Sequence, residues 1–256
     1  LGERKRLAVV GSRDCTEYGI ETTQLLTRPV ARAGVVVVSG LARGIDGTAH
    51  AAALDAGGDT IAVLGNGIDR YYPACNRQLQ ETIARDGMLL TEFPPGAHAL
   101  PYHFPHRNRI IAFLCEAVLV VEAREGGGSL STAARARASF DVLAVPGPIG
   151  RDTSIGTNAL IRDGARIVTA PEDVLEALHV PLRRAPDTGS VEPPDLEGDA
   201  RLVWRALGAE PRHVDEVAAR AGLTRAVVAL SLLQLELAGC ARQLAGSRFA
   251  RARGLR

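Results

Sequence analysis

Arg107 and Arg109 flank Asn108 at the point where a polar loop gives way to the apolar segment Ile110–Phe113. Planar guanidinium groups bind phosphate oxygens in bidentate fashion, and the first N–H groups of a helix lack intrahelical acceptors and attract anions. We therefore expect these three side chains to stand at a helix start whose free N–H groups point outward, since a core helix has no use for such a polar cluster. There they would contact phosphate groups and base edges.

The segment Gly126–Thr132 repeats this pattern farther along the chain. Three glycines form a turn, and Ser129 and Ser131 then place hydroxyl groups at the start of a second helix. Ser154–Asn158 is expected to add another loop of hydroxyl and amide groups. Two anion-binding helix starts in one domain suggest a ligand with several phosphates, and a nucleic acid strand is such a ligand.

Two predicted strands end in small residues with an arginine close behind. Ser12 and Arg13 follow the first strand, whereas Ser39 and Gly40 end the second strand and Arg43 lies in the loop after it. Ligands of parallel α/β sheets bind at the carboxyl ends of the strands, so these side chains are candidate ligand contacts. An ordinary surface role is the alternative for Arg13.

Asp46 and His50 share a helix face because they are four residues apart. They could form an acid–base couple. The favoured interpretation is a structural pair in which Asp46 caps the helix, since the sequence offers no third partner for a catalytic triad or a metal site.

Aromatic residues accompany the arginines. Tyr71 and Tyr72 lie in a loop after Asn66, and Phe104 precedes Arg107 by three residues. Aromatic faces near arginines hold the bases of single-stranded nucleic acids by stacking. Packing against the core is an equally good interpretation for Tyr71 and a weaker one for Tyr72, and for Phe104 a core position is favoured.

Charge and composition limit the function classes. Residues 1–180 carry 18 basic and 20 acidic side chains, and residues 199–256 carry 10 and 5. A nearly neutral main domain argues against a broad cationic surface and is compatible with a focused pocket.

The four cysteines form no Cys-x-x-Cys pair, which indicates reduced thiols in a cytoplasmic protein. No apolar run approaches ~18 residues and no Walker-type Gly-Lys-Ser/Thr sequence occurs, so neither a membrane span nor that type of nucleotide hydrolysis is supported.

Short valine-rich runs alternate with amphipathic segments over the first 180 residues. This pattern predicts an α/β fold, a Rossmann-like doubly wound parallel sheet. The predicted strands are Leu7–Val10, Val35–Ser39, Thr60–Leu64, Met88–Glu92, Ala117–Glu122 and Val142–Val145. The predicted helices are Glu17–Ala33, Gly47–Ala56, Asn76–Arg85, Arg107–Cys115 and Ser129–Ser139.

Residues 181–198 have the composition of a linker, which predicts a main domain over residues 1–180 and a small one over residues 199–256. A turn at Gly222 and a basic, strand-forming tail are typical of a winged helix. The helix after this turn is mostly Ala, Val and Leu, with only Arg225 able to reach DNA, so DNA contact and protein contact are equally supported. The predicted helices of this domain are Asp199–Leu207, His213–Ala221 and Thr224–Ala238.

Taken together, these motifs resemble the DprA/Smf family of DNA-processing proteins. The resemblance covers about residues 7–178 with high specificity, and the C-terminal part resembles the winged-helix domain of that family less specifically. The matched segments are Val10–Arg13, Ser39–His50, Thr60–Asn76, Phe104–Ala112, Leu119–Ala133 and Ala144–Gly164.

The resemblance implies an extended Rossmann-like fold that binds single-stranded DNA without sequence preference, as a homodimer that needs no cofactor or metal. It also implies loading of the RecA recombinase onto incoming strands in natural transformation and recombination. The helical domain that often precedes this fold is expected to be absent from the chain, which starts at Leu1. The DNA-binding residues carried over are Ser12, Arg13, Ser39, Gly40, Arg43, Gly44, Asn66, Tyr72, Phe104, Arg107, Asn108, Gly128, Ser129 and Ser131, with Arg13, Arg43 and Arg107 expected to matter most.

Several positions depart from the family pattern. Ala74 and Tyr102 stand where relatives often have a basic residue, Phe113 and Cys115 replace Gly and Ser, and Phe140 replaces an arginine. These changes remove positive charge around the expected pocket, so the strength and the salt dependence of binding are expected to change with them.

Two other functions are kept as hypotheses. Rossmann-like nucleotide glycohydrolases also use glycine-rich loops at strand ends, and Glu122 could serve as their general acid/base on a nucleoside monophosphate. The Pro-Gly-Gly-x-Gly-Thr loop associated with that class is missing. The other hypothesis is a protein-interaction hub with the winged helix as its docking surface.

Overall fold

A computed structural model describes residues 4–136, 140–181, 196, 198–208, 212–244 and 246–251. The chain divides into two compact units, Leu1–Leu182 and Arg183–Arg256. The predicted linker, residues 181–198, lies mostly outside the described residues.

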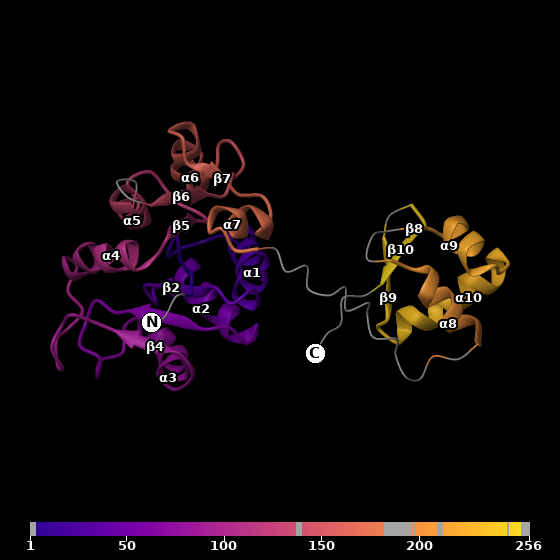
Figure 1. The fold of residues 1–256 in the computed structure, drawn as a ribbon, viewed down its shortest axis with the longest axis horizontal. Helices are drawn as coiled ribbons and strands as arrows, with labels where there is room; N and C mark the ends of the chain where they lie inside the picture. Colours follow the sequence, from indigo (N-terminus) through magenta and orange to yellow (C-terminus); the bar gives the residue numbers. More distant parts are fainter. Residues whose placement is uncertain are drawn as a thin grey trace. The chain divides into compact units, whose positions relative to one another are not determined.

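A parallel sheet of seven strands forms the first unit, in the order β4-β3-β2-β1-β5-β6-β7 (Figure 1). β-Branched valines, which favour extended backbone, fill its central strands. This arrangement confirms the predicted doubly wound, Rossmann-like fold. The strands are β1 (Arg6–Val10), β2 (Val36–Ser39), β3 (Thr60–Val63), β4 (Met88–Leu90), β5 (Ala117–Val120), β6 (Asp141–Ala144) and β7 (Arg166–Ile167).

The strand order places a topological switch point between β1 and β5. The chain runs outward from β1 through β2 and β3 to β4, and then returns through α4 (His103–Leu114) to β5, which pairs with the other side of β1. Loops that leave the carboxyl ends of these two strands diverge and leave a crevice, where ligands of such folds bind.

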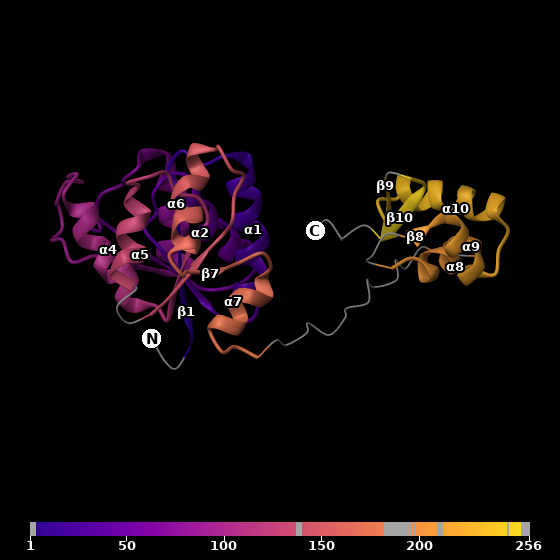
Figure 2. The same cartoon turned by 90° about the horizontal axis from the view of Figure 1, so that it is seen from above.

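Helices cover both faces of the sheet (Figure 2). Leu26 of α1 and Ile45 of α2 pack with α7 on one face, and Ile111 of α4 and Ala133 of α5 pack on the other. Besides α4, the helices of this unit are α1 (Glu17–Arg32), α2 (Ile45–Asp55), η1 (Ala74–Asn76), α3 (Arg77–Asp86), α5 (Gly128–Ala136), α6 (Asp152–Arg162) and α7 (Pro171–Ala177).

Two local predictions are wrong. Helix α4 begins at His103 and not at Arg107, because Pro105 falls in its first turn, where no backbone N–H is needed for an intrahelical bond. Ser154–Asn158 is not a loop but part of α6, which begins at Asp152, an acidic residue suited to a helix start.

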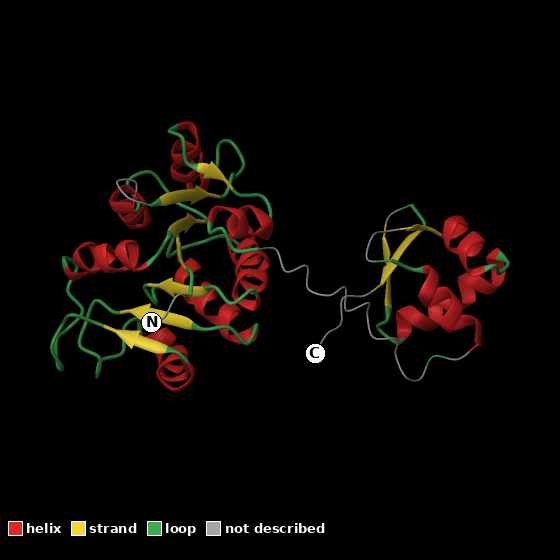
Figure 3. Ribbon diagram, in the orientation of Figure 1, coloured by secondary structure: helices red, strands yellow, loops and turns green. Residues whose placement is uncertain are grey.

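The second unit is a winged helix, as predicted (Figure 3). Gly222 adopts a left-handed conformation between the second and third helices, and Thr224 is the N-cap residue of the third. Val203, Val217 and Leu232 lie in its separate core. The elements are α8 (Gly198–Ala206), β8 (Arg212–His213), α9 (Val214–Ala221), α10 (Arg225–Leu237), β9 (Ala241–Leu244) and β10 (Arg248–Arg251).

Candidate nucleic-acid interface

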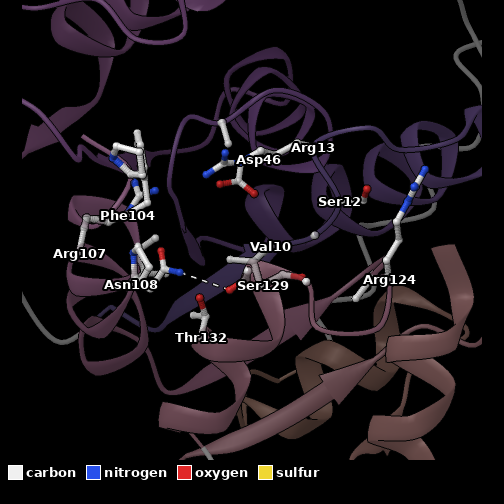
Figure 4. A pocket seen from close by; sticks show the side chains of 18 of the residues that line it. Val10, Ser12, Arg13, Asp46, Phe104, Arg107, Asn108, Arg124, Ser129 and Thr132 are labelled. Carbon is white, nitrogen blue, oxygen red and sulfur yellow. Dashed lines mark hydrogen bonds between the residues drawn. The ribbon is translucent and has the colours of Figure 1, made fainter. Parts of the chain in front are cut away.

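Two adjoining cavities open at the switch-point edge of the sheet. The first, of about 450 Å³, lies between the loops after β1 and β5 and the starts of α4 and α5 (Figure 4). The second, of about 300 Å³, lies beside the loops after β2 and β3. Arg13, Ala42, Tyr72 and Phe104 line both. A continuous crevice with cationic and aromatic walls therefore stands where the fold places ligands.

Phe104, Tyr72 and Arg13 form a cluster between the two cavities, which we call the stacking cluster. The ring centroids of Tyr72 and Phe104 are 5.3 Å apart, and Arg13 Cζ lies 5.1 Å from the Phe104 centroid. Gly65 is required behind it, because a Cβ there would stand 2.9 Å from the Phe104 ring. Phe104 is therefore not a core residue but a half-buried wall of the crevice.

Arg107 points into the protein and not outward. Its side chain is 3 % exposed, and its guanidinium donates to the carbonyl oxygens of Gly40, at 2.8 Å, and Val63. The expectation that this polar cluster lies outside the core fails for Arg107, because Arg107 and Ile111 are four residues apart and share the face of α4 that is buried. A Cβ at position 40 would lie 2.5 Å from the guanidinium, so any larger residue there would displace the Arg107 side chain.

Burial and neighbouring charges set the titration of this guanidinium. Burial lowers the pKa of Arg107 to about 10; Asp46 opposes this shift and Arg13 adds to it. Arg107 therefore stays charged at neutral pH. It supplies a fixed positive charge at the floor of the first cavity, which it lines.

Asp46 and His50 do not form an acid–base couple. The Asp46 carboxylate accepts from the Gly40 N–H at 3.1 Å, and burial raises its pKa, with Arg107 acting in the opposite direction. Asp46 is not the helix cap either: α2 starts after Gly44, whose φ is 72°. A Cβ at Gly44 would collide with the carbonyl oxygen of Ser12, so the tight approach of the two loops demands glycine.

His50 has a separate structural role. Its Nδ1 lies 2.6 Å from Thr60 Oγ1, which itself donates to the Val37 carbonyl at 2.8 Å. Because the Thr60 hydroxyl proton is already used, the imidazole must donate through Nδ1. Burial lowers the pKa of His50 to about 3.

Ser39 and Asn66 shape loops through side-chain bonds to the backbone. The buried Ser39 hydroxyl donates to the Val9 carbonyl at 2.6 Å, and it lines neither cavity. The Asn66 amide donates to the carbonyls of Gly67 and Arg70 at 3.0 and 2.9 Å, while the residue still lines the second cavity. The structure thus brings Asn66 to the crevice but not the Ser39 hydroxyl.

The start of α5 meets α4 across the first cavity. Asn108 Nδ2 donates to the Gly128 carbonyl at 3.3 Å (Figure 4) and to Ser131 Oγ at 3.1 Å. Gly128 and Ser129 line the cavity, and a Cβ at Gly128 would meet open space. The first amides of α5 have no intrahelical acceptors, so an anion at this helix start stays a prediction.

The arginines at the crevice have different partners. Exposed Arg43 lines the second cavity and pairs with Asp14 at 3.2 Å. Arg109 pairs with Glu92 and lines neither cavity, contrary to expectation. The sequence interpretation missed Arg124, an exposed side chain of the first cavity. The rule that singled out Arg13, an arginine just beyond the carboxyl end of a buried strand, would have found it.

Glu122 has a structural role. It is 2 % exposed, and its carboxylate accepts from the N–H and the hydroxyl of Thr16 at 2.9 and 2.6 Å. It lines neither cavity. A general acid/base must reach the bond that it breaks, so this arrangement does not support the glycohydrolase role. Among the residues that the structure describes, no cluster could hold a metal ion and no helix could span a membrane.

Comparisons with known proteins show which family each unit matches. Residues 1–179 match the family of DNA recombination-mediator protein A, and residues 187–247 match the DprA winged helix domain. Protein Smf of Escherichia coli is 46 % identical over 242 residues, which are 91 % of this chain and 64 % of that protein. The chain spans less than two thirds of the length of such curated relatives, with 60 % for DNA processing protein DprA of Streptococcus pneumoniae.

Two solved structures are similar to the first unit. The DNA processing protein A of S. pneumoniae aligns with a TM-score of 0.66 and 45 % identity over 69 % of this chain and 62 % of that one. The H. pylori protein, whose structure was described for its single-stranded DNA binding mode, aligns with a TM-score of 0.63 and 30 % identity over 68 % and 80 %.

Proposed function

Because the chain belongs to the DNA recombination-mediator protein A family, which includes the DprA and Smf proteins, we propose that it binds and protects single-stranded DNA without sequence preference. The observation that carries the proposal is the stacking cluster at the switch point, with Arg13 beside the rings of Phe104 and Tyr72. An unpaired base stacks on such rings, whereas a base within a duplex is not free to do so.

Phosphates of the same strand lie at the cationic groups around the cluster. Arg13, Arg43 and Arg124 provide side-chain contacts, and the first amides of α5 at Gly128 and Ser129 provide backbone contacts. Arg107, at the floor of the first cavity, adds a buried positive charge that attracts the phosphates. Contacts to phosphates and ring faces carry no base identity, so binding is independent of sequence.

The wider role follows from family membership. We propose that the protein acts as a homodimer without a cofactor and loads the RecA recombinase onto strands taken up in natural transformation. It is a binding protein and not an enzyme; the engagement of Glu122 by Thr16 supports this choice over the glycohydrolase.

Two assays test the proposal. The protein should shield a single strand, but not a duplex, from an exonuclease, and Arg43→Ala should weaken the shielding at equal protein concentration. It should also speed RecA assembly on strands already coated with single-strand-binding protein. Equal cleavage with and without the protein would remove the protective role, and an unchanged RecA assembly rate would remove the loading role.

A further inference from the structure

Helix α10 of the winged helix is apolar on two opposite sides. One side faces the domain core through Val228, Leu232 and Leu235, which are buried. A soluble surface helix normally has one apolar side, and a helix that is apolar all round is normally covered. The second apolar side of α10 therefore calls for a partner.

The uncovered side is a continuous row of four residues, Ala226, Leu230, Leu233 and Leu237, which we call the α10 stripe. Its three leucines are 61 %, 54 % and 82 % exposed. The four stripe residues are spaced by four, three and four positions, which places them on one line along the helix.

The stripe is unsuited to reading DNA. The helix at this position of a helix-turn-helix enters the major groove, where polar side chains bond to base edges. None of the four stripe residues carries a hydrogen-bonding side chain, and Arg225 at the helix start pairs with Asp215 at 3.3 Å. This observation favours protein contact over DNA contact, the alternative that the sequence left open.

We propose that the α10 stripe binds the same stripe of a second copy of this chain, with the two helices antiparallel. The row is self-complementary about a point between Ser231 and Leu232. Leu230 then faces Leu233 of the second copy, and Ala226 faces Leu237, so that a small side chain meets a large one at each end.

The charges beside the stripe select the antiparallel direction. Arg225 and Glu236 lie at opposite ends of α10 and both line a cavity of about 310 Å³ between the helix and the β9–β10 hairpin. They therefore stand on the same flank. In an antiparallel pair, Arg225 of each copy lies on the same side of the contact as Glu236 of the other. In a symmetric parallel pair, the charged flanks of the two copies lie on opposite sides of the contact, so neither charge meets an opposite one.

The contact is small. Four side chains per copy correspond to the low end of interface sizes, below about 1,200 Å² in total, where association is weak and transient. Such a contact is effective mainly between molecules that are already held close together, such as two chains on one DNA strand. Its existence does not depend on DNA, and neither does its test.

Sedimentation velocity of the full chain without nucleic acid tests the proposal. Leu233→Asp and Leu230→Lys should each raise the concentration needed for association by about tenfold or more, since each places two desolvated charges in a symmetric contact. Leu25→Asp, at an exposed leucine of α1, is the matched control and should leave association unchanged. Any association through the first unit persists in both α10 variants, so their difference from the wild type reports on the stripe.

A mixture of the two variants tests the register. In the antiparallel pair, the ammonium group introduced at position 230 faces the carboxylate introduced at position 233 of the other chain. The mixture should therefore associate at lower concentration than either variant alone. Leu230→Gln with Leu233→Gln gives a milder disruption, and circular dichroism checks that each variant keeps its helices.

Three outcomes would overturn the proposal. Unchanged association in both variants would show that the stripe is not a self-contact, and no gain in the mixture would exclude the antiparallel register. Loss of duplex DNA binding in the variants, with association unchanged, would make α10 a DNA-reading helix. Because none of these measurements uses single-stranded DNA, their failure is distinguishable from failure of the proposed function.

Discussion

The guanidinium of Arg13 lies beside the Phe104 ring, with Cζ 5.1 Å from its centroid. This relationship joins the loop after β1 to the first turn of α4, two segments about ninety residues apart in the chain. Tyr72 contacts the same ring from the loop that follows β3. Two loops and the start of a helix thus converge at the switch point, which gives the crevice both a stacking surface and a cation.

Replacing Phe104 by leucine should weaken single-strand binding by roughly 1–3 kcal/mol, the usual contribution of one stacked base. Because Phe104 is only half-buried, the fold should survive. The measurement is the Kd for a labelled oligonucleotide. Phe113→Leu, at an exposed ring on the same helix that lines neither cavity, is the control. Equal losses in both variants would argue against a specific stacking position.

Arg13→Ala and Arg43→Ala should each weaken single-strand affinity by roughly 1–3 kcal/mol, as expected for a lost charged contact. Each should also reduce the slope of log K against log salt concentration by about 0.7, because one phosphate contact fewer releases less counterion. Arg85→Ala, on the exposed surface of α3, should change neither quantity. A slope that stays constant in both crevice variants would mean that these cations do not meet phosphate.

Arg107→Ala should lower the stability of the fold as well as the affinity for DNA. The substitution leaves the buried Asp46 carboxyl without its opposing charge and removes donors from two buried carbonyls, which costs about 3–5 kcal/mol. Urea unfolding measures this loss directly. A variant as stable as the wild type that nevertheless fails to bind would show that the guanidinium contacts the ligand and not the sheet.

The burial of His50 should make the free energy of unfolding depend on pH. Its pKa is lowered to about 3 in the folded protein, against 6.5 for the free side chain, so the folded state binds fewer protons between these values. The stability linked to His50 is complete above pH 6.5 and is lost as the pH falls towards 3, by up to about 1.4 kcal/mol per pH unit. His50→Asn should flatten this slope between pH 6 and 4, measured by urea unfolding, while other titrating groups act equally in both proteins. Parallel curves would refute the assignment.

Glu122→Gln separates binding from glycosidic chemistry. The variant should bind single strands as the wild type does, because the carboxylate lies outside the crevice, and should unfold at lower urea concentration because a charged bond to Thr16 is weakened. Neither protein should release free base from a nucleoside monophosphate. Base release by the wild type that disappears in the variant would revive the enzyme hypothesis.

The sheet was predictable because its strands are continuous valine-rich runs, which leave little choice but burial in a parallel sheet. The direction of Arg107 was not, since it depends on which face of α4 packs against the sheet and on the carbonyl groups that meet the guanidinium there. The Arg107 guanidinium donates to the carbonyls of Gly40, just after β2, and Val63, at the end of β3. Only the tertiary fold brings these two carbonyls together. Strand β7 escaped prediction because it has only two residues, both exposed.

The crevice is proposed to hold single-stranded DNA. Fluorescence anisotropy of a labelled strand measures this binding, and a strand of ~35 nucleotides is long enough for several binding sites. The strand and its duplex are titrated with the wild type and Arg13→Ala across a salt series. We expect a clear preference for the single strand that weakens steeply with salt, with a smaller slope in the variant. Weak binding to both nucleic acids, flat in salt and identical in the two proteins, would contradict it.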